Sequence, residues 1–104
     1  MLSDLSRFIK QQLRAGDFIS RRGGEEFIIL MRDTGAEDGA MIIERVRQSV
    51  EARGFDTGKM QIRVTLSFGI SETGEAATLE DLIDRADDRL YRAKEQGRNR
   101  VIYS

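Results

Sequence analysis

The stretch from Arg14 to Phe27 reads R-A-G-D-F-I-S-R-R-G-G-E-E-F, and it decides the fold. Its Gly23-Gly24 pair stands between two apolar runs. A glycine pair flanked in this way predicts a β-hairpin with a tight turn. We expect the two strands to cover residues 17–22 and 25–31.

Glu25 and Glu26 follow the glycines directly and would lie at the tip of this hairpin. Bare glycine backbone beside two carboxylates is a place where an anion or a metal ion could come close. A glycine turn with two solvated acids explains the same spacing without any ligand. Spacing alone leaves both interpretations open.

Residues Gly23–Phe27 resemble the signature of the GGDEF family, the diguanylate cyclases, in its GGEEF form. The Arg14-Ala15-Gly16-Asp17 run, five residues ahead, stands where the family carries its RxxD inhibitory site for cyclic di-GMP. Other runs resemble the family's late strand, its last helix and the turn after it: Val64–Ile70, Arg85–Asp87, Leu90–Lys94 and Gly97–Arg100. The resemblance covers essentially all 104 residues, but only the later part of the family's domain.

The remaining patterns predict three helices and two more strands around the hairpin. Apolar residues at helical spacing predict a helix over 3–14, with Ser3 capping its start and Gly16 ending it in a left-handed conformation, so that Arg14 falls in its last turn. Thr34 and Glu37 match a capping box for a second helix, which runs up to Gly54 with Ile42, Ile43, Val46 and Val50 along its core face.

Strict alternation of apolar residues predicts a strand over 62–70 with one buried face. Thr78 is expected to cap the last helix and Gly97 to stop it, with Leu79, Leu82, Ile83, Ala86 and Leu90 facing the core. Residues 101–103 can add a short edge strand. The order α-β-β-α-β-α-β indicates one α+β domain over residues 1–104, a mostly antiparallel sheet layered with helices, which resembles a partial ferredoxin-like GGDEF fold.

Composition narrows the function. Charged residues make up 34% of the chain but nearly cancel, to a formal net charge of −1, which disfavours a nonspecific DNA-binding protein. The chain has no cysteine and no histidine, so catalysis would depend on carboxylates, Lys, Arg and backbone. No apolar run is long enough to span a membrane and no signal peptide pattern opens the chain, so we expect a cytoplasmic protein.

Arg14 and Asp17 have side chains that suit guanine. An arginine fork can donate to guanine O6 and N7, and a carboxylate can accept from N1–H and N2–H. The resemblance implies a second arginine from the helix after the hairpin, and an ungapped count places it at Arg45. It also implies that cyclic di-GMP often binds as an intercalated dimer. The plainer alternatives are a helix-end cation, a turn residue and a solvated helix arginine.

The resemblance also implies what the chain lacks. Family members begin with a strand and helices that carry a Mg²⁺-binding Asp and the side chains that hold the guanine of GTP. Glu25 matches the carboxylate that shares this metal, and one carboxylate is a poor Mg²⁺ site. Lys94 and Arg98 match positions that contact GTP phosphates. We therefore expect Glu25 and Glu26 to be vestigial, GTP binding to be weak or absent, no tightly bound cofactor, and Mg²⁺ only if catalysis occurs.

The lost strand would be central in the family's sheet, so we expect open edges. Direct pairing of strands 25–31 and 62–70 and homodimerisation could each cover them, and the sequence does not choose between the two. Three functions follow. The favoured one is a catalytically impaired cyclic di-GMP receptor or sink that uses Arg14, Asp17 and Arg45. The second is a diguanylate cyclase represented only by its later part, and the third is a dimerising scaffold that binds nothing.

Overall fold

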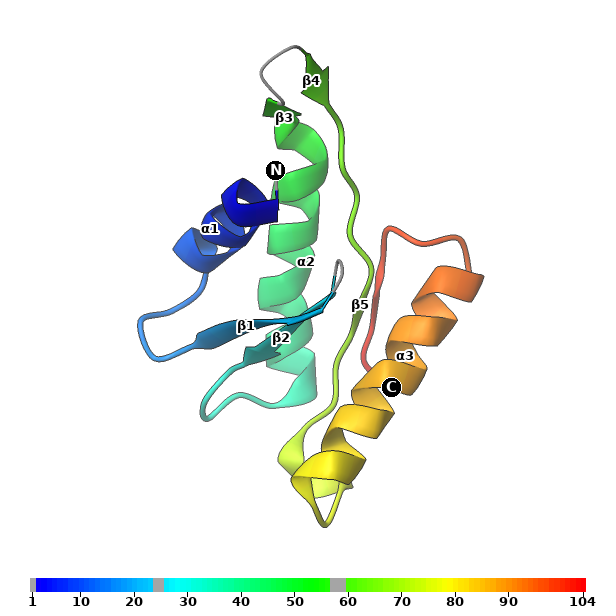
Figure 1. Ribbon diagram of the computed structural model, residues 1–104. Helices are drawn as coiled ribbons and strands as arrows, with labels where there is room; N and C mark the ends of the chain where they lie inside the picture. Colours follow the sequence, from blue (N-terminus) through cyan, green and yellow to red (C-terminus); the bar gives the residue numbers. More distant parts are fainter. Residues whose placement is uncertain (1, 24–25, 57–59) are drawn as a thin grey trace.

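A computed structural model of the protein describes residues 2–23, 26–56 and 60–104 (Figure 1). The helices are α1 (Leu2–Gln12), α2 (Ala36–Arg53) and α3 (Leu79–Glu95), with a 3-10 turn η1 (Thr73–Glu75). The strands are β1 (Phe18–Gly23), β2 (Glu26–Leu30), β3 (Phe55–Asp56), β4 (Gln61–Ile62), β5 (Phe68–Gly69) and β6 (Val101–Ile102). The chain is thus a mixed α/β fold, which confirms the fold class expected from the sequence.

Strands β1 and β2 form the predicted antiparallel hairpin, which crosses in front of α2 in Figure 1. Phe18 pairs with Leu30 at its open end, and a register shift lies between Arg21 and Gly23 near the turn. Gly24 and Glu25, at the turn itself, lie outside the described residues. The hairpin prediction is confirmed to within a residue or two at each end.

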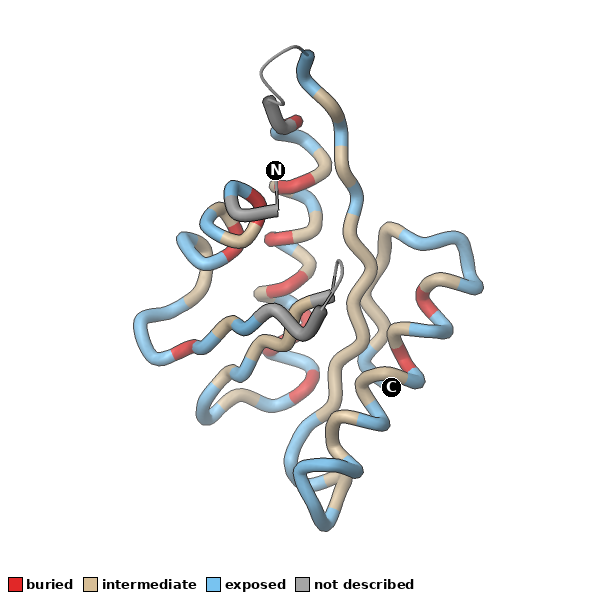
Figure 2. Tube along the Cα trace, in the orientation of Figure 1, coloured by how far each residue is buried: buried red, intermediate tan, exposed pale blue. Residues whose placement is uncertain are grey.

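The core lies where α1 packs on α2. Leu5 and Ile9, four residues apart on α1, meet Val46 and Val50, four apart on α2, and each is at most 3% exposed. This spacing places each pair on one helix face. Figure 2 shows buried positions repeating along the inner side of α2. Burying one such side chain contributes roughly 1.5–3 kcal/mol, so this contact is the main anchor of the N-terminal half.

A second layer forms where α3 packs on β5 and β6. These strands pair in parallel: Phe68 N–H donates to Arg100 O and Ile70 N–H to Ile102 O, both at 2.9 Å. Thr78 caps α3 as predicted, because its Oγ1 accepts from Asp81 N–H at 3.1 Å. Gly97, with φ of 119°, follows the end of the helix and lets the chain turn back toward β6.

The first helix ends earlier than predicted. It stops at Gln12, Ser3 lies inside it, and Arg14 lies beyond it. In the part of the chain that the structure describes, the glycines with positive φ are Gly54 and Gly97. The prediction that Gly16 adopts a left-handed conformation was therefore also wrong. The reason is the Asp17 carboxylate, which accepts from the backbone N–H of Arg14 and closes a turn in place of the helix.

Two other local predictions were wrong. The N-cap of α2 is Gly35, with no side-chain cap, while the Thr34 hydroxyl donates to Arg32 O at 2.8 Å. Leu79 is 64% exposed, because it sits in the first turn of α3 beyond the end of β5. The other four predicted core residues of α3 are half-buried.

The long strand predicted over residues 62–70 is hydrogen-bonded only at its ends, in β4 and β5. Residues 63–67 run extended between them in Figure 1 and belong to no ladder among the described residues. The predicted alternation of inner and outer side chains is present. Val64 and Leu66 pack against the α1–α2 core and are half-buried, while Arg63 and Thr65 are exposed. In the described ranges the ladders form three separate two-stranded sheets, and β2 does not pair with this segment. The possibility that strands 25–31 and 62–70 pair directly was therefore wrong.

Candidate ligand-binding site

The Arg-x-x-Asp pair forms a closed corner between α1 and β1. The Oδ2 of Asp17 accepts from Arg14 N at 3.0 Å and from Arg14 Nε at 3.4 Å. The Asp17 side chain is 2% exposed, whereas that of Arg14 is 52% exposed. The corner therefore buries the carboxylate and presents the guanidinium.

The loop between β2 and α2 holds the far end of Arg14. Its Nη2 donates to Arg32 O at 3.2 Å and to Thr34 Oγ1. Thr34 thus acts as an acceptor for Arg14 instead of capping α2. Three anchors on one arginine fix the direction of its planar fork, which lowers the entropy cost of binding a ligand.

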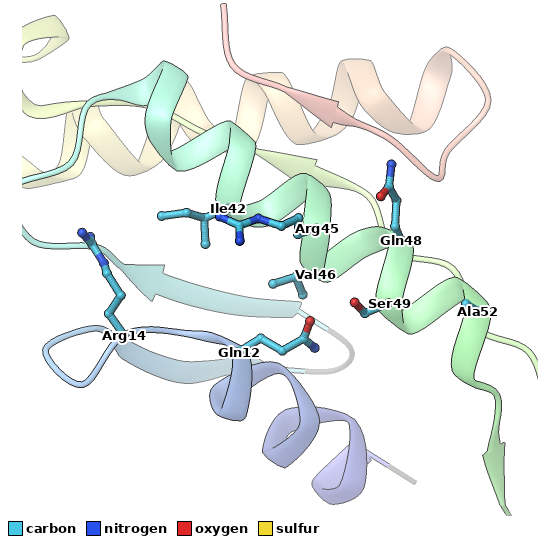
Figure 3. Close-up of a pocket in the computed structure, with 8 residues that line it drawn as sticks. All are labelled: Gln12, Arg14, Ile42, Arg45, Val46, Gln48, Ser49 and Ala52. Carbon is cyan, nitrogen blue, oxygen red and sulfur yellow. The ribbon is translucent and has the colours of Figure 1, made fainter.

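A groove of about 640 Å³ runs between α1 and α2 and brings Arg14 and Arg45 to one surface (Figure 3). It is lined by Gln12, Arg14, Ile42, Arg45, Val46, Gln48, Ser49 and Ala52. Figure 3 shows Arg14 at one end, Gln12 reaching from α1 toward α2, and Arg45 lying along α2 beside Ile42. The groove combines an apolar floor with two cations, a combination suited to a flat, anionic, hydrogen-bonding ligand.

Arg45 is exposed on α2 and has no hydrogen bond or ion pair with any described residue. Its neighbours differ: Gln48 donates to Glu44 Oε2 at 3.0 Å, and Gln12 donates to Phe8 O at 3.2 Å. The guanidinium of Arg45 is therefore available to a ligand without breaking a contact to the described part of the protein. The solvated-face alternative describes the same exposure, so exposure alone does not separate the two.

Lys94 and Arg98 line a second groove, of about 330 Å³, between β2, residues 64–69 and α3. Its lining is mostly apolar and includes Phe27, Ile28 and Ile29 from the strand that follows the Gly-Gly turn. Two cations therefore face the same groove as β2, as a phosphate contact would require. Asp87 lies in the same lining and lowers the net positive charge there.

The turn that carries Arg98 is tied to α2. Asn99 Oδ1 accepts from Arg47 Nη1, and Asn99 Nδ2 donates to Glu51 Oε2, both at 2.7 Å. Arg47 also donates to both carboxylate oxygens of Glu44, at 2.7 and 2.6 Å, and these bonds lower the pKa of Glu44 and raise that of Arg47. Arg98 and Asn99 both have positive φ, so this network offsets backbone strain at the turn.

Most of the candidate catalytic and metal-binding residues lie outside the residues that the structure describes. Gly24 and Glu25 fall in the undescribed turn, and Gly23 and Glu26 are placed only as backbone partners in the hairpin. Across residues 2–23, 26–56 and 60–104, no three or more carboxylates, histidines or cysteines gather where they could hold a metal ion. The structure therefore gives no geometry for a Mg²⁺ site, and the roles of Glu25 and Glu26 stay predictions.

Sequence reasoning missed three residues around these grooves. It assigned Thr34 to a helix cap and did not single out Gln12 or Arg47. The contact of Thr34 with Arg14, that of Arg47 with Asn99 and the place of Gln12 in the groove all depend on elements far apart in the chain, so no local pattern could have revealed them. Asn99 stood in a recognised run, but its contacts to α2 were not foreseen.

Known proteins resemble this chain over nearly its whole length. Residues 1–100 match the family described as diguanylate cyclase, GGDEF domain. Diguanylate cyclase A of Treponema denticola is 36% identical over 105 residues, which cover 100% of this chain and 28% of the relative. The chain thus spans about a quarter of the length of this relative.

Solved structures agree with the fold. Diguanylate cyclase SiaD of Pseudomonas aeruginosa, in complex with its activator SiaC, superposes with a TM-score of 0.90 at 34% identity, covering 99% of this chain and 40% of that one. The coiled coil and GGDEF domain of DgcB from Caulobacter crescentus, in complex with c-di-GMP, has a TM-score of 0.84 at 26% identity, covering 99% and 56%. No helix in the described part of this chain is long and apolar enough to cross a membrane. With a family match over residues 1–100 and the same fold in these structures, the chain belongs to the diguanylate cyclase GGDEF domain family.

Proposed function

We propose that this chain binds cyclic di-GMP in the α1–α2 groove through Arg14, Asp17 and Arg45, and acts as a receptor or sink for this messenger. The observation that carries the proposal is that Arg14 and Arg45, far apart in the sequence, line one groove. The GGDEF domain of DgcB, solved in complex with c-di-GMP, has the same fold and gives independent support.

The three residues have different roles in this proposal. Arg14 donates through Nη1 to the O6 or N7 edge of guanine, because its Nε and Nη2 are already bonded to Asp17, Arg32 and Thr34 and hold the exposed guanidinium in one orientation. Asp17 is buried and holds Arg14 in place, so its contribution is to pre-organise the site. Arg45 stacks on a base or contacts a phosphate, since it is exposed and has no described partner. An intercalated pair of ligand molecules would let both arginines meet a base.

Isothermal titration calorimetry with cyclic di-GMP tests the proposal. We expect the intact chain to bind, and Arg14→Ala and Arg45→Ala each to weaken binding by about 10-fold or more, because a lost charge-assisted hydrogen bond or cation–π contact is worth about 1–3 kcal/mol. Arg7→Ala is the matched control, because the Arg7 side chain is 68% exposed on α1 and does not line the groove. This variant should bind cyclic di-GMP as tightly as the wild type does. A folded protein that does not bind cyclic di-GMP would refute the proposal.

We also propose that these 104 residues, tested alone, do not convert GTP efficiently. The reason is chemical: phosphoryl transfer needs Mg²⁺ held by more than one carboxylate, and Glu25 would have to hold it alone. The rival function, diguanylate cyclase activity, is favoured by relatives such as diguanylate cyclase A of Treponema denticola. Incubation with GTP and Mg²⁺ separates the two, since clear formation of cyclic di-GMP would establish the enzyme.

Homodimerisation is the third element of the proposal. Among the described residues, β2 has a strand partner on one edge only and residues 63–67 belong to no ladder, so another chain could add a strand at either place. Light scattering over a range of concentrations should then show a dimer in the absence of ligand. If the dimer forms but cyclic di-GMP does not bind, the scaffold function is the better description.

A further inference from the structure

Thr34, in the loop between β2 and α2, contacts both Arg14 and Arg32 through its hydroxyl group. The hydroxyl oxygen accepts a hydrogen bond from Nη2 of Arg14, and the hydroxyl donates to Arg32 O at 2.8 Å. Arg32 O also accepts from Nη2 of Arg14, at 3.2 Å. Two oxygens of this loop therefore hold one nitrogen of a guanidinium that comes from the α1–β1 corner.

The backbone of the loop brings these two oxygens together. Asp33 has a positive φ of 53°, a conformation that aspartate tolerates better than most residues. The turn at Asp33 folds the Thr34 hydroxyl back onto the carbonyl of Arg32, two residues earlier. Figure 3 shows the Arg14 side chain reaching from the α1–β1 corner toward this loop.

The methyl group of Thr34 keeps the hydroxyl turned toward Arg14. A Cβ built on Gly39 would lie 3.7 Å from Thr34 Cγ2, so the methyl packs over this glycine. Gly39 N–H donates to Gly35 O at 2.9 Å, which places the glycine in the first turn of α2. Because a β-branched side chain has few favourable χ1 rotamers, a methyl seated on α2 fixes the direction of the hydroxyl.

We propose that Thr34 is a positioning residue for Arg14, which it holds with Nη1 directed at the guanine edge in the α1–α2 groove. The inference rests on the proposed function and extends the site to a loop residue that does not itself line the groove. Thr34 acts through Arg14 and adds no contact to the ligand. An arginine that is already held in one rotamer loses less freedom on binding, so the hydroxyl raises the affinity for cyclic di-GMP.

Two substitutions separate the hydroxyl of Thr34 from its methyl group. Thr34→Val removes the hydroxyl and keeps the methyl over Gly39, and we expect it to weaken cyclic di-GMP binding about 5-fold in calorimetry. Thr34→Ser keeps the hydroxyl and should bind within about 2-fold of the wild type. Thr73→Val is the matched control, because Thr73 is exposed in η1 and does not line the groove, and its affinity should not change.

Two further measurements test whether Thr34 acts through Arg14. Once Arg14 is alanine, Thr34→Val should have no further effect on affinity. In the absence of ligand, ¹H–¹⁵N spectra of the arginine side chains report the Nη protons directly, with Arg14→Ala identifying the Arg14 signals. Because hydrogen-bonded donors exchange slowly with water, we expect these signals in the wild type and in Thr34→Ser, and their broadening or loss in Thr34→Val.

The outcomes separate this inference from the proposed function. If Thr34→Val binds cyclic di-GMP as tightly as the wild type, or leaves the Arg14 signals unchanged, the positioning role is overturned while the proposed function stands. If Thr34→Ser loses as much affinity as Thr34→Val, the methyl contact with α2 explains the loss, and the role is again overturned. If the folded wild-type chain binds no cyclic di-GMP, the proposed function fails and takes the guanine-directing role with it, while the Arg14 signals still show whether Thr34 holds the arginine.

Discussion

The amide of Asn99 is inserted between two charged side chains of α2, accepting from Arg47 and donating to Glu51, each at 2.7 Å. Its backbone N–H also donates to Ser67 Oγ at 3.0 Å. One residue thus joins α2, the segment before β5 and the turn after α3. The side chain of Arg47 is 13% exposed and that of Glu51 is 45% exposed, so this joint is shielded from water on its Arg47 side.

Asn99→Ala should lower the free energy of unfolding by about 2 kcal/mol. The change leaves Arg47 and Glu51 each short of a partner and places alanine at a positive φ of 50°, which asparagine tolerates better. Urea denaturation measures the loss. Gln96→Ala, at the exposed C-cap of α3, should change it by less than about 0.5 kcal/mol, and equal effects at both sites would show that the network does not stabilise the fold.

The ion pair between Glu75 and Arg89 should make stability depend on acid pH. Arg89 Nη1 donates to Glu75 Oε2 at 2.9 Å, Nη2 to Oε1, and Nη1 also to Ile70 O at 2.7 Å. The hydrogen bonds from Arg89, then that from the Glu72 backbone, lower the pKa of Glu75 from 4.5 to about 2. The folded state therefore gains stability from ionised Glu75 above pH 4.5 and loses it as the pH falls toward 2.

Glu75→Gln is expected to cost about 1–2 kcal/mol at pH 7, because charge-assisted hydrogen bonds to a buried guanidinium are replaced by weaker ones. The difference from wild type should shrink between pH 4.5 and 2, because Glu75 of the unfolded chain is protonated in this range while Glu75 of the folded protein stays ionised until the pH approaches 2. Thermal denaturation across this range measures it. Glu95→Gln, on the exposed last turn of α3, serves as control, and a Glu75→Gln deficit that is independent of pH would contradict the argument.

Gly69 should tolerate no side chain. A Cβ added there would lie 2.1 Å from Ala86 O and 2.3 Å from Leu90 N, both backbone atoms of α3. Because backbone cannot move aside without shifting the helix, Gly69→Ala should destabilise the fold by roughly 3 kcal/mol.

The control for this substitution is Gly74→Ala, where a Cβ meets nothing within 4 Å. Its unfolding midpoint in urea should match wild type. If the two variants unfold at the same midpoint, the close approach of α3 to β5 is not what holds the second layer together.

The sequence predicts best where one local pattern decides the structure. Gly23-Gly24 set the hairpin, and Thr78 set the start of α3, because a turn and a cap depend on neighbours within four residues. The capping pattern at Thr34 is equally local, but the structure does not follow it. The hydroxyl of Thr34 accepts a hydrogen bond from Arg14, twenty residues earlier in the chain, and does not cap α2. Gln12 carries no pattern at all, since its place in the groove depends on how α1 and α2 pack.

The alternation of apolar and polar residues along 62–70 predicts which side chains are buried. It does not predict which strand forms hydrogen bonds with this segment. Val64 and Leu66 pack inward as the pattern requires, but a ladder needs a neighbouring strand about 4.8 Å away, which sequence periodicity cannot supply. The same limit applies to Arg14 and Asp17. Their spacing predicted the pair, while the burial of one and the exposure of the other came only from packing.

In the described ranges residues 63–67 belong to no ladder, and this has a consequence for alignment. Moving an extended chain by two residues returns every side chain to its original face, so alternation cannot distinguish one alignment from the next. The alignment must instead be fixed at the two ends, where Ile62 pairs with Phe55 and Phe68 pairs with Val101. Two short pairings therefore decide which apolar residues the middle of the segment delivers to the core.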